Sequence, residues 1–352
     1  MTAIDQPPPV ALPADYDPDE VIDDFRLACI ARAIDERELT LQKQNKVFFE
    51  TSGAGHEALG LGLARSLRPS YDWFFPYYRD LALVLGLGVT PYSVLLQAVG
   101  SSEDPSSGGR QMPGHYGSHE HNLVSVSSPV ATQLLHAVGI ALAAKIRKTG
   151  QVAMTSMGEG SSNQGDVHEG LNFAAIHKLP FIFVVENNGY AISVPMAKQV
   201  AGSSVWERAS GYGIPGVVVD GEDVLACYKA SRDAVARARA GEGPTLIEAK
   251  VTRLTAHSSD DQQTKYRSEE ELAAEKGRDA LPKFRAQLVD AGILTPDAEE
   301  RIKAANAHDV DDATDYAESQ PDPDPTTTMK WVFTKNWPGE TPPPWGMGGG
   351  DD

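Results

Sequence analysis

Apolar residues in the first half of the chain recur at helical spacing. The stretch from residue 21 to 44 carries such a stripe, which predicts a helix packed against a larger body. Its members are Val21, Phe25, Ile30, Ile34 and Leu41. Residues 56–67, 91–100 and 131–148 predict further helices. Between residues 104 and 128 the chain is rich in Gly, Ser and His without apolar periodicity, which favours a binding loop.

From residue 151 the pattern changes to short apolar runs that alternate with helical stretches. The runs are "VAMTSMG", "FIFVVEN", "GVVVD" and "PTLIEAKVT", and helical stretches such as "GDVHEGLNFAAIHKL" lie between them. This alternation is typical of an α/β fold with a mostly parallel central sheet flanked by helices. A charged, helical C-terminal segment over residues 269–318 and an extended tail are expected to follow.

The ends of the chain differ in composition from its body. Residues 1–20 are rich in Pro and Asp and are predicted to form a flexible N-terminal arm. Residues 21–330 are predicted to form one domain, and 331–352 a Pro- and Trp-rich C-terminal arm. Because this last segment carries Trp331, Trp337 and Trp345, we expect it to lie on another subunit or to strap across its own chain.

Charge and composition exclude several classes of function. The 352 residues have a formal net charge of −18, which argues against binding to nucleic acid or anionic lipid. No apolar run reaches 18 residues and the start lacks a secretory pattern, so we expect a cytoplasmic protein that does not span a membrane. The two cysteines, Cys29 and Cys227, lie in helical patterns and are expected to fill the core.

One stretch combines glycines, a carboxylate and two asparagines. It begins with "GEG" at Gly158 and ends with "NN" at Asn188. Each motif ends a predicted strand, and a right-handed crossover places both strand ends at one edge of the sheet. Backbone N–H groups beside glycines favour phosphate, while Glu159 and Asn188 offer oxygen ligands that suit magnesium. The stretch predicts a magnesium-bridged diphosphate; the alternative is an ordinary turn with capping asparagines.

The motif order resembles a known family. "YYRD", "GRQMPGHYGS", "SSPVATQ", "GEGSSNQGD", "ENNGYAIS" and "HSSDDQQTKYRSEEE" occur as in alpha subunits of the thiamine diphosphate-dependent decarboxylases of 2-oxo acid dehydrogenase complexes. The resemblance spans about residues 30 to 330 and implies a thiamine diphosphate-binding fold. "RQMPGHYG" and "SSPVATQ" are similar to the branched-chain (2-oxoisovalerate) type, whereas "NQGD" and Glu186 look more like the pyruvate type.

The resemblance implies roles for individual residues. Magnesium would be held by Glu159, Asn188 and the carbonyl of Tyr190. The diphosphate would meet Gly160 and Ser161 at a helix start, together with Tyr78 and Arg79, and Ser128 and Val130 would line the two rings of the cofactor. Some relatives hold potassium in the same loop, which corresponds here to Ser127, Pro129, Thr132 and Gln133.

Three further features carry alternatives. Arg79 would otherwise pair with Asp80 at a helix start. Glu186 stands where branched-chain relatives often carry an arginine that contacts phosphate, so that positive contact is missing or comes from elsewhere. Trp73, Phe74 and Phe75 are expected either to shape an acyl pocket or to belong to the core.

Histidines supply the remaining candidate chemistry. The resemblance gives His257 contact with the cofactor and a part in moving protons during acyl transfer. The spacing of its loop departs from the family's by one residue. For His115, His119 and His121 we expect a substrate-side or loop-ordering role; the alternative is a zinc site, although the loop contains no cysteine.

The resemblance also implies partners. No carboxylate in this chain is a convincing activator of the cofactor, and in the family that residue comes from a beta subunit in an α2β2 heterotetramer. The substrate would be a small-molecule 2-oxo acid, and the acyl group would pass to the lipoyl domain of a transacylase. Alternatives are an alpha subunit of a pyruvate or acetoin dehydrogenase, a self-sufficient thiamine enzyme, and a non-catalytic paralogue.

Overall fold

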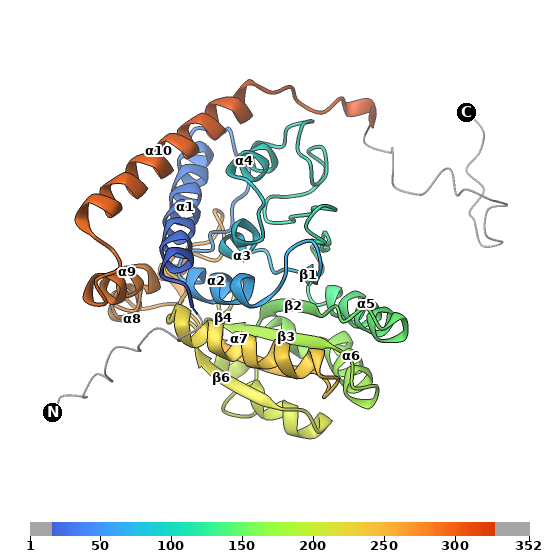
Figure 1. Cartoon of the computed structure of the whole chain (residues 1–352). Helices are drawn as coiled ribbons and strands as arrows, with labels where there is room; N and C mark the ends of the chain where they lie inside the picture. The colour runs from blue at the N-terminus through green and yellow to red at the C-terminus, as the bar shows by residue number, and fades with distance from the viewer. Residues whose placement is uncertain (1–15, 328–352) are drawn as a thin grey trace, which may run out of the picture.

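The computed structural model describes residues 16–327, which fold around a five-stranded parallel sheet (Figure 1). The strand order is β1-β2-β3-β7-β6, formed by Trp73–Phe75, Ala153–Gly158, Phe181–Asn187, Thr245–Lys250 and Gly216–Asp220. A two-stranded hairpin, β4 (Tyr190–Ala191) and β5 (Val194–Pro195), follows β3. The predicted α/β class with a mostly parallel sheet is therefore confirmed.

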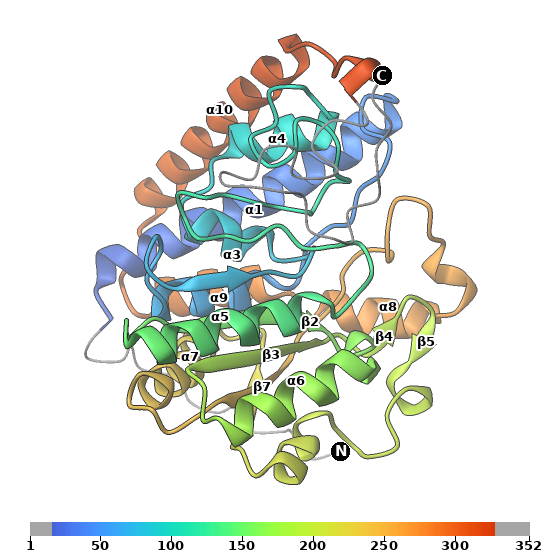
Figure 2. The same cartoon turned by 90° about the vertical axis from the view of Figure 1, so that its right-hand side faces the viewer.

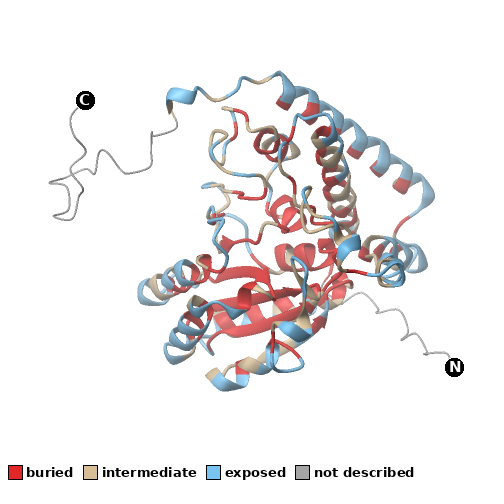
Figure 3. Ribbon diagram, turned by 180° about the vertical axis from the view of Figure 1, so that it is seen from behind, coloured by how far each residue is buried: buried red, intermediate tan, exposed pale blue. Residues whose placement is uncertain are grey.

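Helices cover both faces of the sheet. On one face lie α5 (Gln133–Arg147) and α6 (Gly165–Ile176), seen in front of the strands in Figure 2. On the other face, α2 (Glu57–Ser66) and α7 (Val224–Arg239) pack together. The strand side chains alternate between these two cores: Ile182 and Val184 join one, and Phe181 and Phe183 join the other. Figure 3 shows the buried sheet between the two layers.

A second helical layer lies beyond α2. It contains α1 (Pro18–Lys43), α3 (Leu81–Gly86), α4 (Pro91–Val99), and the C-terminal helices α8 (Glu269–Lys276), α9 (Ala280–Asp290) and α10 (Pro296–Ser319). The long helix α10 runs across α1 and α4, with its outer face exposed (Figures 1 and 3). All five predicted apolar positions of α1 are buried. The helical character predicted for residues 269–318 is thus borne out as three helices.

The structure bears on one of the two predicted arms. Residues 16–20 belong to the folded body: Tyr16 is buried and stacks on Tyr228 at 4.5 Å, and α1 begins at Pro18, where Asp17 caps the backbone N–H of Asp19. The C-terminal arm proposed for 331–352 lies outside the described residues. No helix of residues 16–327 is long and apolar enough to cross a membrane.

Other sequence expectations concern single side chains. Phe74 and Phe75 lie in β1 and are fully buried on its two faces, so these two aromatic residues belong to the core. Cys227 is buried and Cys29 is partly buried at the edge of the core, and both thiols are free.

Buried carboxyl groups lie where α1 meets the segment before α2. Burial, followed by the charge of nearby Asp35, raises the pKa of Glu50 to about 8; burial also raises the pKa of Asp35 to about 7. Atom Oε1 of Glu50 is buried without a hydrogen-bond partner among the described residues. The folded chain therefore keeps a proton on Glu50 that the unfolded chain loses near its ordinary pKa of 4.5.

This burial predicts a stability effect that depends on pH. A raised carboxyl pKa reduces stability as pH rises from about 4.5 through the folded value near 8, since the unfolded chain ionises first. Glu50→Gln removes that loss. Denaturant unfolding at pH 5 and at pH 8 measures this effect. We expect the free energy of unfolding of the variant, relative to wild type, to increase by about 1–3 kcal/mol from pH 5 to pH 8. The exposed Glu36→Gln is the control, and equal gains at both pH values would contradict the prediction.

Candidate cofactor site

The predicted site residues surround one cavity at the carboxyl edge of the sheet. Its volume is about 300 Å³. Every residue predicted for the cofactor or for magnesium lines it, namely Tyr78, Arg79, Ser128, Val130, Glu159, Gly160, Ser161, Asn188, Tyr190 and His257. Residues from five separate parts of the sequence therefore meet at one place, where parallel α/β sheets bind ligands.

Strand pairing explains how the two motifs meet. Strands β2 and β3 are parallel neighbours, and Gly158 at the end of β2 pairs with Glu186 near the end of β3. The predicted adjacency of the "GEG" and "NN" motifs is confirmed. Glu159 and Asn188 each follow the paired ends by one or two residues, and both side chains are buried.

Two glycines let other groups approach closely. A Cβ at Gly158 would lie 2.9 Å from the Tyr77 hydroxyl, and one at Gly160 would lie 2.5 Å from the Cβ of Ala191. Helix α6 begins at Gly165, as the stretch "GDVHEGLNFAAIHKL" predicted, and a 3₁₀ turn over Ser161–Asn163 precedes it. Gly160 and Ser161 thus stand at the start of the 3₁₀ turn.

A single methyl group at Gly160 should damage the site. Because its Cβ would overlap Ala191, the strand end or the hairpin must shift. We expect Gly160→Ala to lose about 1–3 kcal/mol of stability and at least tenfold in thiamine diphosphate affinity, measured by thermal unfolding and calorimetric titration. The matched control is Gly165→Ala, whose added Cβ meets nothing within 4 Å. Equal affinities of the two variants would refute the prediction.

The acidic side of the site is Glu159. Burial raises the pKa of this carboxyl, while hydrogen bonds from its own backbone N–H, from Nε2 of Gln199 at 3.2 Å and from the backbone of Asn188 act to lower it. A buried carboxylate of this kind gains from a bound cation. Asn188 accepts a hydrogen bond from the backbone N–H of Tyr190 at 3.2 Å, which fixes the turn that presents the Tyr190 carbonyl. One carboxylate and neutral oxygens fit magnesium.

The basic side of the site is built on Arg79. Its guanidinium is buried and donates to the carbonyl of Ser52 at 2.6 Å and to the carbonyl of His257 at 2.7 Å. Asp80 instead accepts from the backbone of Tyr77 and from Ser156, so the alternative of a helix-start pair between Arg79 and Asp80 is wrong. The Tyr78 hydroxyl accepts a hydrogen bond from Tyr77 at 2.7 Å.

His257 is held neutral beside Arg79. Burial, then the charges of Arg79 and Arg253, lower its pKa to about 4. Arg79 lies 3.2 Å from Nδ1, and because a guanidinium only donates, Nδ1 is the acceptor and the ring proton sits on Nε2. Asp261 accepts from the backbone N–H of His257 at 2.8 Å and from the Tyr266 hydroxyl, which fixes the loop.

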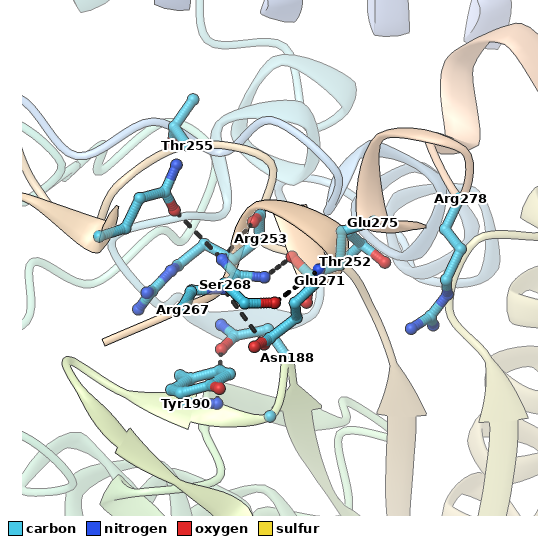
Figure 4. Close-up of polar contacts among 12 residues, drawn as sticks. Asn188, Tyr190, Thr252, Arg253, Thr255, Arg267, Ser268, Glu271, Glu275 and Arg278 are labelled. Atoms are coloured by element: carbon cyan, nitrogen blue, oxygen red, sulfur yellow. Dashed lines mark hydrogen bonds and ion pairs between the residues drawn. The ribbon is translucent and has the colours of Figure 1, made fainter. Parts of the chain in front are cut away.

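Sequence reasoning missed Arg253. It is buried, donates to the Ile192 carbonyl at 3.0 Å and to the Tyr266 hydroxyl at 2.7 Å, and lies over the rings of Tyr190 and Tyr266. Arg267 packs over Tyr190 as well and pairs with Glu271 and Glu275 (Figure 4). The sequence does place Arg253 just after β7, at the same sheet edge as the "NN" motif, and that position could have predicted its place near the cavity.

Glu186 does not face the cavity. It is fully buried, contacts His56 Nδ1, and interacts with Asp80; burial raises its pKa to about 7. The position that often carries a phosphate-binding arginine in the branched-chain type therefore serves an internal network here. Arg253 is a further positive group near this site, and its charge acts on Glu159.

The loop before α5 orders the rim of the cavity. His115 is buried, with Nδ1 3.0 Å from the Met112 carbonyl and Nε2 2.9 Å from the Ser128 hydroxyl. This contact places His115 in a loop-ordering position. Within residues 16–327 no group of three or more His, Cys, Asp or Glu side chains is arranged to hold a metal, which gives the zinc alternative for this loop no support.

The four potassium candidates divide into two groups. Ser127 donates to the Pro129 carbonyl at 2.9 Å and contacts Thr132, so three of them touch one another. Gln133 turns inward and donates to the Ser156 carbonyl at 3.2 Å.

The geometry first defines a class, an α/β protein with a cleft suited to a metal-bridged diphosphate. Comparison with known proteins then gives the family: residues 25–326 match the model of the dehydrogenase E1 component, and the chain belongs to that family. Membership implies a thiamine diphosphate-dependent 2-oxo acid dehydrogenase.

The similar relatives include both substrate types. The chain is 47% identical over 316 residues to the 2-oxoisovalerate dehydrogenase subunit alpha of Bacillus subtilis, covering 90% of this chain and 96% of the relative. It is 38% identical to the 3-methyl-2-oxobutanoate dehydrogenase subunit alpha of Mycobacterium tuberculosis, covering 90% and 83%. The pyruvate dehydrogenase E1 component subunit alpha of Staphylococcus aureus is 36% identical, with 86% and 79% covered. The resemblance to alpha subunits of the branched-chain type is confirmed.

Proposed function

We propose that this chain is the alpha subunit of a branched-chain 2-oxo acid dehydrogenase that acts on 3-methyl-2-oxobutanoate. The observation that carries the proposal is the gathering of every predicted cofactor residue around one cavity, in a chain 47% identical to a 2-oxoisovalerate dehydrogenase alpha subunit. The reaction is oxidative decarboxylation with acyl transfer to the lipoyl group of a transacylase. A cytoplasmic location is part of the proposal.

Glu159, Asn188 and the Tyr190 carbonyl would hold magnesium. The fit rests on the buried carboxylate of Glu159, whose pKa is raised by burial, and on the position of all three residues at one cavity. Arg79 and Tyr78 would bind the diphosphate, since a guanidinium fork and a hydroxyl both donate to phosphate oxygens. A potassium ion at Ser127, Pro129 and Thr132 would order the rim; Gln133 would join only by turning away from Ser156.

Thiamine diphosphate, when bound, supplies the carbanion that adds to the 2-oxo acid and accepts the electrons left by carbon dioxide. Ser128 and Val130 orient its rings at the cavity rim. His257, neutral with its proton on Nε2, would donate from that atom to the reacting group, and Arg79 with Asp261 keeps the imidazole in place. Val130 and Ile192 are apolar residues of the cavity that are exposed in this chain, so they would exclude water only once a second chain covers them.

A beta subunit would complete the site in an α2β2 heterotetramer. Residues 127–130, which form the rim of the cavity, are exposed in this chain. An exposed rim beside a cofactor cavity is consistent with closure by a second chain that brings the activating carboxylate. The lipoyl domain of the transacylase would then approach the same opening.

A pyruvate dehydrogenase alpha subunit is the second candidate. Two observations favour it. Glu186 is buried and makes no phosphate contact, unlike the arginine that branched-chain relatives often carry at this position, and a relative from Staphylococcus aureus is a pyruvate dehydrogenase E1 component subunit alpha. The two substrates differ by methyl groups, each worth about 1–3 kcal/mol in an apolar pocket.

The test is decarboxylation by this chain, alone and co-expressed with its beta partner, with thiamine diphosphate and magnesium. We expect activity only with the partner and at least a tenfold preference in kcat/KM for 3-methyl-2-oxobutanoate over pyruvate. A preference for pyruvate would reject the branched-chain assignment. Activity of the chain alone would reject the shared site.

A further inference from the structure

A glutamine in the loop after β5 contacts the proposed metal carboxylate. Nε2 of Gln199 donates to Oε1 of Glu159 at 3.2 Å and to the Val194 carbonyl at 2.6 Å. Because both contacts are to oxygen acceptors, they fix which end of the amide faces Glu159. Gln199 therefore holds one oxygen of Glu159, a residue that lines the cavity.

The other end of this amide lacks a partner. Oε1 of Gln199 is buried and accepts no hydrogen bond from residues 16–327. It lies 3.2 Å from the place where a Cβ at Gly160 would be, at the start of the turn predicted to receive the diphosphate. An amide oxygen needs a donor, and diphosphate oxygens are acceptors. A water molecule in the hydration shell of a metal is a donor of the required kind.

A second carboxylate anchors the loop that carries Gln199. Glu248 in β7 accepts from Nδ2 of Asn187 at 2.6 Å, from the backbone N–H of Trp206 at 2.8 Å, and from Ser204. Its pKa is lowered, since hydrogen bonds from Lys250, Ser204 and Asn187 outweigh the effect of burial. One ionised group thus ties the first asparagine of the "NN" motif to the loop that ends at Trp206.

We infer that Gln199 is a further positioning residue of the magnesium–diphosphate site: Nε2 fixes the Glu159 carboxylate, and Oε1 accepts from a water molecule of the metal's hydration shell. The inference rests on the proposed function. Residues that orient a metal ligand in this way typically change metal affinity by about 10- to 100-fold when removed.

The experiment measures magnesium binding rather than turnover. The chain co-expressed with its beta partner is stripped of metal with a chelator and titrated with Mg²⁺ at fixed thiamine diphosphate, followed by intrinsic fluorescence. We expect Gln199→Met, which keeps the volume, to raise the apparent Kd for Mg²⁺ about tenfold. Gln199→Asn, which withdraws the same amide by one methylene, should do likewise. At saturating Mg²⁺ both variants should recover wild-type cofactor affinity within about twofold.

The control is Gln151→Met. Nε2 of Gln151 also donates to a backbone carbonyl, that of Tyr71 at 2.7 Å, but Gln151 lies just before the start of β2, whereas the cavity lies at the end of that strand. A Mg²⁺ affinity of the Gln199 variants within twofold of wild type would overturn the inference, as would a cofactor defect that excess Mg²⁺ does not rescue. A wild-type complex that binds neither Mg²⁺ nor thiamine diphosphate would instead reject the proposed function.

Discussion

Glu159→Gln should abolish magnesium-dependent cofactor binding while leaving the metal-free protein at least as stable as wild type. The substitution keeps the shape of the side chain and removes its charge. Burial raises the pKa of Glu159 despite its hydrogen bonds and the charge of Arg253, so the ionised carboxylate disfavours the folded, metal-free state. Mg²⁺ gains from that same charge, and its loss should raise the Kd for Mg²⁺ by at least about 100-fold, or about 2.7 kcal/mol.

Two measurements separate these effects. Thermal unfolding without cofactor reports the stability of the metal-free protein, and the rise in Tm on adding Mg²⁺ and thiamine diphosphate reports binding. The rise should disappear in Glu159→Gln and persist in Glu169→Gln, an exposed control on α6. A Tm rise of wild-type size in Glu159→Gln would show that the metal lies elsewhere.

His257→Gln should impair acyl transfer to the lipoyl domain more than cofactor binding. A positioned proton donor or acceptor typically contributes about 10²- to 10⁴-fold to a rate. We expect lipoyl-domain acylation to fall at least about 100-fold, with thiamine diphosphate affinity changed by less than about fivefold. Decarboxylation coupled to an artificial electron acceptor should fall less. His177→Gln, exposed after α6, is the control.

The pH dependence gives an independent check on His257. Its pKa is lowered to about 4, so the imidazole is neutral throughout the range above about pH 5. A titration of His257 in the free enzyme would therefore affect kcat/KM only below that range. If His257→Gln removed an inflection between pH 6 and 7, the buried, neutral state of the imidazole described here would be wrong.

The pattern of apolar residues determined the class of fold because each period is local. The apolar stripe of α1 predicted a helix, and the apolar runs of β2, β3, β6 and β7 predicted strands; the structure has these elements at those positions. The strand β1 was not predicted, since a run of three residues carries too little periodicity. The sequence predicted the start of helix α1 at residue 21, three residues too late. The packing of Tyr16 on Tyr228, which orders the chain before α1, joins positions far apart in the sequence and leaves no local pattern.

The site divides in the same way. Glycine spacing and strand order placed Glu159 and Asn188 at the carboxyl edge of a parallel sheet, and the resemblance to the family supplied Tyr78, Arg79 and His257; all five line the cavity. Only the tertiary structure placed Gln199 on Glu159 and Arg253 on Tyr190, and only it turned Glu186 away from the cavity toward His56. Those contacts join separate loops and depend on burial, which no local pattern in the sequence encodes.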